Sequence, residues 1–291
     1  MKIIAKNKSD LLTFLQEKVG YNSKTKVKTY LKNGFVLINN KIAKTIDDEI
    51  NEGDVVSIEK IKRISRNGHE IHAPFNILFE NEEFVAVNKP VGVFSSAIKD
   101  KKSRNVLSEM QKYYKTKDIE PTRLFILNRL EKELSGVLLF AKDYHIHRLL
   151  EKNWLKAHTY RWYALTEGAV SPNEGEFSDS ILMNFNGKKV EKEALTEYET
   201  INKSTENSLL KIITQNTVRN QVRIHLRNNR TPILGDITFS ANKTNLDRVC
   251  LHLFSINFDH PKTDEHIEIK SPLPKEFLTF IKKKLKKQKE L

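Results

Sequence analysis

The first sixty residues combine two helical patterns with short strand patterns. The apolar residues of stretch 11–15 (LLTFL) recur as on one face of a helix. Ser23 is a typical N-cap, so a second helix is expected over about 24–33, ending at Gly34. Apolar stretches predict three strands after it, at residues 35–39, 41–45 and 55–60. Two helices and a small twisted sheet therefore form one unit over residues 1–60.

Residues 75–280 show mainly strand patterns, which predicts a larger α+β domain around a mixed or antiparallel sheet. Expected strands lie at residues 77–90 (a hairpin), 136–142, 158–168, 208–218 and 266–274. Helices are expected at 219–228 and from about Lys275. The weakly periodic basic stretch 61–74 reads as a linker, and 281–291 as a basic C-terminal tail that continues the last helix.

Composition narrows the class of protein. The chain has 291 residues and a single cysteine, Cys250, which excludes a disulfide framework and a cysteine-based zinc cluster. No apolar run approaches the roughly 18 residues of a membrane helix, and the first residues lack the apolar core of a signal peptide. We therefore expect a cytoplasmic protein, without membrane association and monomeric by default.

The net charge of +13 favours a polyanionic partner, although a lysine-rich composition alone can produce it. Lys24, Lys28 and Lys32 recur every four residues on the second expected helix, with Lys26 beside them. Such a stripe can follow a phosphate backbone without reading sequence. The alternative is an ordinary solvated helix face.

Residues 11–58 resemble an S4 RNA-binding domain. The match comprises the Leu-rich first helix, the basic helix after Ser23, and the stretches 34–39 and 53–56. Lys24 and Asn40 stand where the usual pattern has Arg and Gly. This resemblance implies that the basic helix binds structured RNA through Lys24, Lys26, Lys28 and Lys32.

Two segments of the larger domain carry candidate chemistry. In stretch 127–142, Glu131 lies just before a buried strand, where a carboxylate can be held rigidly as a nucleophile or base. Its alternative is an ordinary loop charge. In stretch 217–236, Arg223 lies between apolar residues, so it points inward and requires a carboxylate partner. Phosphate loops, dinucleotide fingerprints and nucleophile elbows are absent, and the spacing of His145 and His147 argues against a metal site.

Residues 75–275 resemble the catalytic domain of the RluA family of RNA pseudouridine synthases. The landmarks occur in the family's order: residues 87–92 (VNKPVG), 128–142 (NRLE, SG and AK), 221–226 (QVRIHL), 232–236 (PILGD), 251–252 (LH) and 272–274 (PLP). The resemblance implies isomerisation of uridine to pseudouridine in structured RNA, most naturally ribosomal RNA, without a metal or other cofactor. A target base must leave its stack to be reached.

The same resemblance assigns the site residues. Glu131 occupies the position of the essential Asp, Arg223 is its expected ion-pair partner, and Trp162, or Tyr160 or Tyr163 after a small shift, packs on the base. Lys89 and Arg129 are expected RNA contacts. The departures from the family pattern are Asn128 for His, Leu134 for Thr, Thr217 and Val218 for Gly-Arg, Asn220 for His, and Glu131 for Asp. They leave two hypotheses open: an active synthase that uses Glu131, or a catalytically inactive RNA-binding and ribosome-assembly factor.

Overall fold

The computed structural model describes residues 2–21, 23–59, 70–97, 103–117, 123–185, 187–215, 218–242 and 244–285. The chain divides into two compact units, residues 1–74 with 109–123, and residues 75–108 with 124–291. Most of the expected linker 61–74 and the end of the expected tail 281–291 lie outside the described residues. No helix in the described ranges is long and apolar enough to span a membrane.

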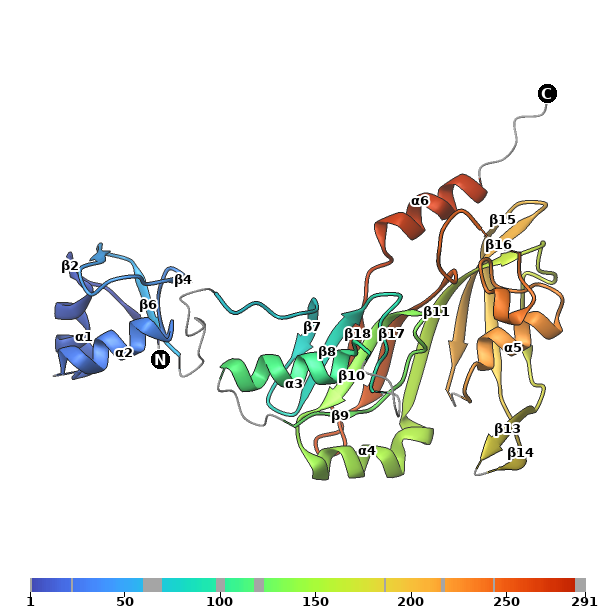
Figure 1. The fold of residues 1–291 in the computed structure, drawn as a ribbon, viewed down its shortest axis with the longest axis horizontal. Coiled ribbons are helices and arrows are strands. Elements are labelled where there is room, and N and C mark those ends of the chain that lie inside the picture. The colour runs from blue at the N-terminus through green and yellow to red at the C-terminus, as the bar shows by residue number, and fades with distance from the viewer. Residues whose placement is uncertain are drawn as a thin grey trace. The chain divides into compact units, whose positions relative to one another are not determined.

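The N-terminal unit contains the two helices expected from the sequence, α1 (Leu11–Val19) and α2 (Lys24–Lys32). The Ser23 hydroxyl accepts a hydrogen bond from the Lys26 amide at 3.4 Å, which confirms Ser23 as the N-cap of α2. Strands form a sheet in the order β1 (Lys2–Ile4), β6 (Val55–Ile58), β3 (Val36–Ile38) and β4 (Lys41–Ile42), and β2 (Ser9–Asp10) pairs with β5 (Glu49–Ile50) (Figure 1). Val27 and Leu31 of α2 are buried in the core of this unit, whereas its lysines are exposed.

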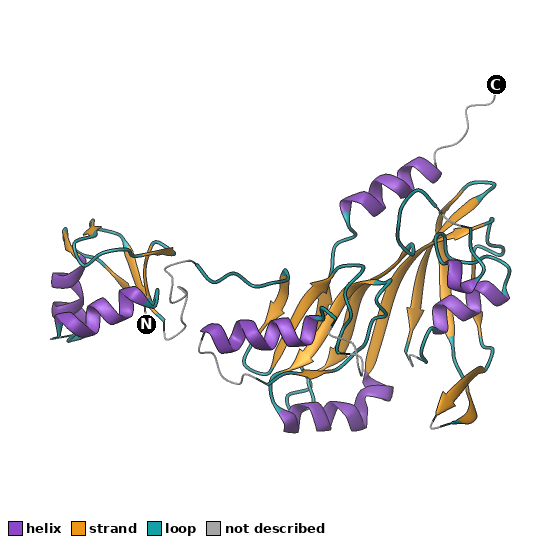
Figure 2. Ribbon diagram, viewed as in Figure 1, coloured by secondary structure: helices purple, strands orange, loops and turns teal. Residues whose placement is uncertain are grey.

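The second unit is built on one large sheet, drawn in orange in Figure 2. Its strands follow the order β12, β15, β16, β11, β17, β10, β8, β7, with β18 beside β17 and β9 beside β10. The strand bounds are β7 Ile77–Glu80, β8 Phe84–Lys89, β9 Phe125–Ile126, β10 Ser135–Ala141, β11 His158–Glu167, β12 Glu174–Phe177, β15 Thr196–Lys203, β16 Asn207–Thr214, β17 Leu251–Asp259 and β18 His266–Lys270. Neighbours are antiparallel except β10 and β17, which run parallel. The sheet is therefore mixed, and the α+β fold class is confirmed.

The remaining elements are α3 (Val106–Lys117), α4 (Tyr144–Ala157), α5 (Gln221–Asn228), α6 (Lys275–Lys284) and a separate hairpin of β13 (Ile181–Phe185) and β14 (Lys188–Lys192) (Figure 1). The sequence predicted α5 and α6 but not α3, α4, the hairpin, or the sheet strands β9, β12, β15 and β17.

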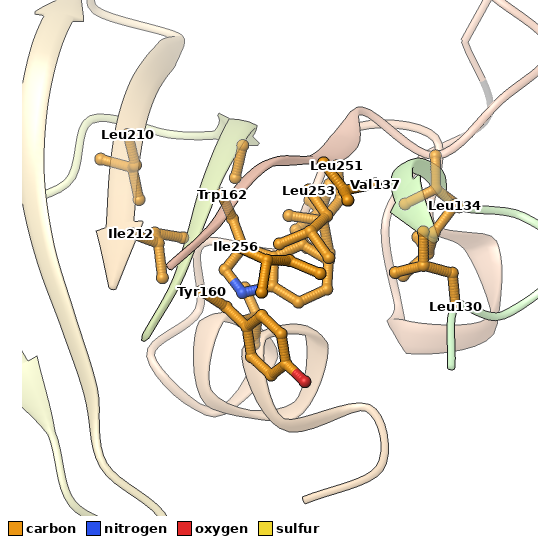
Figure 3. Packing of buried hydrophobic residues seen from close by; sticks show 14 of the residues in the cluster. Leu130, Leu134, Val137, Tyr160, Trp162, Leu210, Ile212, Leu251, Leu253 and Ile256 are labelled. Carbon is orange, nitrogen blue, oxygen red and sulfur yellow. The ribbon is translucent and has the colours of Figure 1, made fainter. Parts of the chain in front are cut away.

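The core lies around β10, whose seven residues are all buried. Figure 3 shows Val137 of this strand among Leu251 and Leu253 of β17, with Tyr160 and Trp162 nearby. Gly136 has a φ of +131°, and a Cβ built there would lie 2.2 Å from the Leu253 carbonyl oxygen. Only glycine permits this approach of β10 to β17, so Gly136 determines where the loop before β10 enters the core.

Candidate active site

A cleft of about 720 Å³ opens in the second unit beside β10, β11 and β17. Its walls come from stretches 94–97, 127–134, 158–162 and 218–223, with further contributions from Met183, Leu251 and Leu253. The fold therefore brings together five of the residues selected from sequence, namely Arg129, Glu131, Tyr160, Trp162 and Arg223. These residues are far apart in sequence, so it is the tertiary fold that brings them to one cleft.

The loop that carries Glu131 is fixed by partners from a distant part of the chain. The Ser95 hydroxyl donates to the Leu130 carbonyl oxygen at 2.7 Å and accepts from the Leu130 amide at 3.1 Å. The Gly92 amide donates to the Lys132 carbonyl oxygen at 2.8 Å. Because the backbone is held on both sides of Glu131, the placement of its carboxylate depends on its own side-chain rotamer.

Asn128 anchors the start of the same loop. Its side-chain amide donates to the Val137 carbonyl oxygen at 3.0 Å, and its Oδ1 accepts from the Leu139 amide at 2.8 Å. The side chain is buried, so both bonds are shielded from water. Asn128 thus continues the pairing with β10 where β9 ends.

Lys89 is not an RNA contact, and that expectation is wrong. Its side chain is completely buried, and Nζ donates to the carbonyl oxygens of Leu134 at 2.7 Å and Pro90 at 3.0 Å. Burial lowers the pKa of Lys89 to about 7, although the charges of Glu133 and Glu131 oppose the shift. Lys89 therefore holds the end of the Glu131 loop, and its buried ammonium group cannot contact a ligand.

Lys89 should make stability depend on pH. The folded protein loses the Lys89 proton near pH 7, whereas the unfolded chain keeps it up to about pH 10.5, so the free energy of unfolding rises with pH across that window. One proton corresponds to about 1.4 kcal/mol per pH unit. Urea unfolding at pH 7.5, 8.5 and 9.5 measures this dependence. The free energy of unfolding should rise more steeply with pH for the wild type than for Lys89→Met, which has no amino group to titrate. Lys188→Met, on an exposed strand, is the control, and parallel curves for wild type and Lys89→Met would contradict the assignment.

The expected ion pair between Glu131 and Arg223 is absent among the described contacts, which corrects the sequence-based pairing. Arg223 instead forms a bidentate pair with Asp236: Nε donates to Oδ2 and Nη2 to Oδ1, both at 2.7 Å. Nη1 donates to Asn220 Oδ1 at 3.1 Å. The expectation that Arg223 points inward to a carboxylate is correct, since Arg223 and Asp236 are 4% and 1% exposed, but the carboxylate is Asp236.

Glu131 remains within electrostatic range of Arg223. Burial alone would lower the pKa of Arg223, but hydrogen bonds to Asp236 and the charges of Asp236, Glu131 and Glu133 raise it above its ordinary value. Glu131 is half-buried in the cleft wall. Both side chains line the cleft, and the guanidinium is held by Asp236, so the described contacts leave the Glu131 carboxylate without an ion-pair partner.

Alternation along β11 separates the three candidate aromatic residues. Tyr160 and Trp162 are buried side chains that line the cleft, and their ring centroids lie 6.3 Å apart (Figure 3). Trp162 Nε1 donates to Thr214 Oγ1 at 3.1 Å, which fixes the indole against β16. The ring centroids of Tyr163 and Phe254 lie 5.2 Å apart, and Tyr163 is not among the residues that line the cleft. Tyr160 and Trp162 are thus the rings positioned for a planar ligand.

The exposed part of the cleft lining carries three cations and one carboxylate, Glu133. Arg129, Lys132 and Arg219 are exposed and belong to the lining, and Lys132 Nζ lies 5.3 Å from the ring centroid of Phe94. A groove that combines exposed cations with aromatic rings is typical of single-stranded nucleic-acid binding. The described surface of the cleft therefore suits a polyanion that presents a base.

A buried polar chain supports the strand behind the loop. The Ser135 hydroxyl contacts His252 Nδ1 at 2.7 Å and accepts from Arg248 Nη2 at 2.6 Å, and His252 Nε2 contacts the Ser271 carbonyl oxygen at 3.1 Å. Burial lowers the pKa of His252 to about 4, so the imidazole is neutral. Both Ser135 and His252 are inaccessible, so this Ser–His contact is structural.

Sequence reasoning missed Asp236, Ser95 and the anchoring role of Asn128. The landmark at 232–236 contains Asp236 but gives no partner for it, and nothing in the local pattern distinguishes Ser95. Thr217 lies outside the described residues, as do residues 286–291 of the tail. Within the described ranges, no group of three or more His, Cys, Asp or Glu side chains is arranged to hold a metal ion.

Comparison with known proteins identifies the family. Residues 83–228 match the family model described as RNA pseudouridylate synthase, which is half of the chain. The chain belongs to the RNA pseudouridylate synthase family. The match includes the Glu131 loop, β11 and α5, and so covers most of the cleft.

Curated relatives align over about two thirds or more of this family member. An uncharacterized RNA pseudouridine synthase of Aquifex aeolicus is 26% identical and covers 86% of each chain. The ribosomal large subunit pseudouridine synthase D of Vibrio cholerae is 22% identical over 87% of this chain and 84% of its own. The dual-specificity RNA pseudouridine synthase RluA of the same organism is 25% identical over 65% of this chain and 78% of its own.

Solved structures share the fold. Human RNA pseudouridylate synthase domain containing 4 superposes with a TM-score of 0.58 at 18% identity, covering 70% of this chain and 90% of that one. The human domain-containing 1 protein gives a TM-score of 0.56 at 18% identity, covering 69% and 84%. At this identity the similarity concerns the fold alone.

Proposed function

We propose that this protein isomerises uridine to pseudouridine in structured RNA, and that its substrate is large-subunit ribosomal RNA. The observation that carries the proposal is the cleft of a family member in which an unpaired carboxylate, Glu131, lies near the oriented guanidinium of Arg223 and the rings of Tyr160 and Trp162. The ribosomal substrate follows the names of relatives such as synthase D of Vibrio cholerae.

The proposed reaction breaks the bond between N1 of uracil and C1′ of ribose, rotates the base, and forms a bond from C5 to C1′. The hydrogen on C5 is released to solvent and N1 gains a proton, so no electrons are exchanged and no oxidant or reductant is consumed. The reaction therefore requires a placed carboxylate, a binding site for an extruded base and no redox partner. We propose that the protein works without a metal or organic cofactor, as a cytoplasmic monomer.

Each cleft residue has a role in this proposal. Glu131 acts as the nucleophile or base at the nucleoside, and its extra methylene relative to Asp is accommodated by the fixed loop around it. Arg223 stabilises the carboxylate and is itself oriented by Asp236. Tyr160 and Trp162 pack on the base, and Arg129 contacts a phosphate from the rim.

The direct test of the proposed function is nucleoside analysis of RNA. Transcribed, unmodified large-subunit ribosomal RNA of Vibrio cholerae is incubated with the protein, digested to nucleosides and separated by chromatography. Pseudouridine should appear at the expense of an equal amount of uridine. Absence of pseudouridine, with RNA binding retained, would replace the proposal by the alternative of a catalytically inactive RNA-binding and assembly factor.

We also propose that residues 1–60 form an S4-like RNA-docking domain, joined by linker 61–74 to a catalytic domain of residues 75–280 with a basic tail at 281–291. Lys24, Lys26, Lys28 and Lys32 are all exposed on α2, whereas its Val27 and Leu31 are buried. Lys26 Nζ lies 4.5 Å from the ring centroid of Tyr21. This arrangement presents cations along one helix to a phosphate backbone.

Replacing Lys24, Lys28 and Lys32 together by Ala should weaken RNA binding and flatten its salt dependence. Loss of three phosphate contacts lowers the slope of log K against log salt by about 2 to 3. Filter binding to the same ribosomal RNA at several salt concentrations measures both quantities. The control removes Lys8, Lys41 and Lys44, which lie outside α2 and carry the same total charge. Equal effects of the two triple variants would show that α2 has no special role.

A further inference from the structure

A second aromatic surface lies outside the cleft, at the N-terminal end of α4. We define the α4 aromatic patch as Phe125, Tyr144, His145 and His147. The Phe125 ring centroid lies 5.5 Å from those of both Tyr144 and His147. The Tyr144 and His147 rings are stacked at 6.4 Å with an interplanar angle of 21°, as the helical spacing i, i+3 permits.

Tyr144 is exposed to an unusual degree. Among the Phe, Tyr and Trp side chains whose exposure the structure describes, it is the most exposed, at 53%. His145 beside it is also exposed. The His147 ring stacks on the phenol ring and the Phe125 ring meets it at an angle of 55°, while the rest of the Tyr144 side chain is exposed to solvent. A supported ring that is exposed to solvent is suited to stacking on another planar group.

The patch lies close to the cleft, two residues along the chain from Leu127 of its lining. Phe125 belongs to β9, and the Leu127 amide donates to the Leu139 carbonyl oxygen at 3.0 Å, which continues the strand pairing. Side chains two residues apart on a strand share a face, so Phe125 lies on the same face as Leu127, which lines the cleft. Their Cα atoms are separated by about 7 Å, a distance that a few nucleotides span. Figure 1 shows α4 beside β9 and β10.

Stacking, rather than charge, is what the patch offers. The carboxylate of Asp143 caps α4 by accepting from the amides of His145 and Ile146. Arg148 pairs with Glu151 one turn further along the helix. These charges are already matched, whereas the exposed ring of Tyr144 adds attraction for a base of any identity.

We propose that the α4 aromatic patch is a second RNA subsite, at which Tyr144 stacks on an unpaired base that flanks the nucleotide in the cleft. This inference rests on the proposed function for the identity of the polymer. Holding a flanking base keeps neighbouring nucleotides out of the helical stack while the target base enters the cleft. The subsite would therefore raise affinity for unpaired RNA without reading sequence.

The test measures binding by the full-length protein to two probes. One is a single-stranded uridine dodecamer, and the other is an abasic dodecamer with the same ribose-phosphate backbone. Tyr144→Ala should weaken binding of the uridine dodecamer by about 5-fold to 10-fold and leave binding of the abasic dodecamer unchanged. The slope against salt should stay constant, because no charge is removed. Tyr144→Phe should bind both probes like the wild type.

The matched control is Leu149→Ala, an apolar side chain that is 38% exposed on the same helix. It should leave both affinities unchanged. Equal losses for the two probes, or no loss for either, would overturn the inference. Since the readout is binding, a protein that fails to isomerise uridine but shows the base-dependent loss keeps the subsite and loses only the proposed function. If the wild type isomerises uridine but Tyr144→Ala shows no base-dependent loss of binding, the proposed function stands and the subsite does not.

Discussion

Glu131→Gln should lower the single-turnover rate of uridine isomerisation on the order of 1000-fold or more. The substitution keeps the size of the side chain but removes the charge, and with it the capacity to act as a nucleophile or base. The Glu131 carboxylate has no hydrogen-bond or ion-pair partner among the described contacts, and the backbone hydrogen bond from the Leu134 amide to the Glu131 carbonyl oxygen is kept, so the variant should fold normally. The rate is measured with enzyme in excess over transcribed ribosomal RNA, together with RNA affinity and the unfolding midpoint as controls.

Glu131→Asp is the informative companion variant. The backbone on either side is held by Ser95 and Gly92, so the shorter side chain withdraws the carboxylate by about 1.5 Å, the length of one carbon–carbon bond. A displacement of this size costs on the order of 100-fold in rate. If the Asp variant were faster than the wild type, the cleft would not be adapted to Glu. If the Gln variant kept the wild-type rate, Glu131 would have no part in the chemistry.

Asp236→Ala should destabilise the second unit by about 3–5 kcal/mol, because it leaves the buried guanidinium of Arg223 without its bidentate partner. Both tryptophans of the chain, Trp154 and Trp162, belong to this unit, so their fluorescence in a urea titration reports its unfolding selectively. Isomerisation should also fall, since Arg223, which lines the cleft, loses the contact that holds its guanidinium in place.

The double variant Arg223→Met with Asp236→Leu separates the ion pair from the cost of a lone buried charge. Replacing both partners by apolar side chains of similar volume is often close to neutral in stability. The double variant should therefore be more stable than Asp236→Ala while remaining inactive. If the double variant were destabilised as strongly as the single one, the loss would come from packing, for instance against Phe239, whose ring centroid lies 4.6 Å from Arg223 Cζ.

Local patterns predicted the elements whose residues carry their own signals. Ser23 predicts the start of α2, and the apolar run after Gly136 predicts β10. Strand β17 was missed because buried polar residues interrupt its apolar pattern. His252 and Ser255 are both inaccessible, and the partner of His252, Ser135, is 117 residues away in sequence. A polar residue in a central strand becomes interpretable only when its distant partner is known.

The site was predictable to the extent that residue chemistry limits the choices. An arginine between apolar neighbours implied a buried carboxylate partner, but the sequence does not say which carboxylate, and only the three-dimensional arrangement selects Asp236 over Glu131. The turn that delivers Asp236 depends on Gly235, where a Cβ would lie 2.2 Å from the Arg248 carbonyl oxygen. Lys89 was misjudged because sequence shows its charge but not its burial.

The central claim, that this cleft isomerises uridine with Glu131, is tested most directly by release of tritium from C5. RNA transcribed with uridine tritiated at C5 is incubated with the wild type and with Glu131→Gln. The account predicts release by the wild type in proportion to the pseudouridine formed, and none above background by the variant. If the wild type released no tritium while it bound the RNA with normal salt dependence, the protein would be an RNA-binding factor without the reaction.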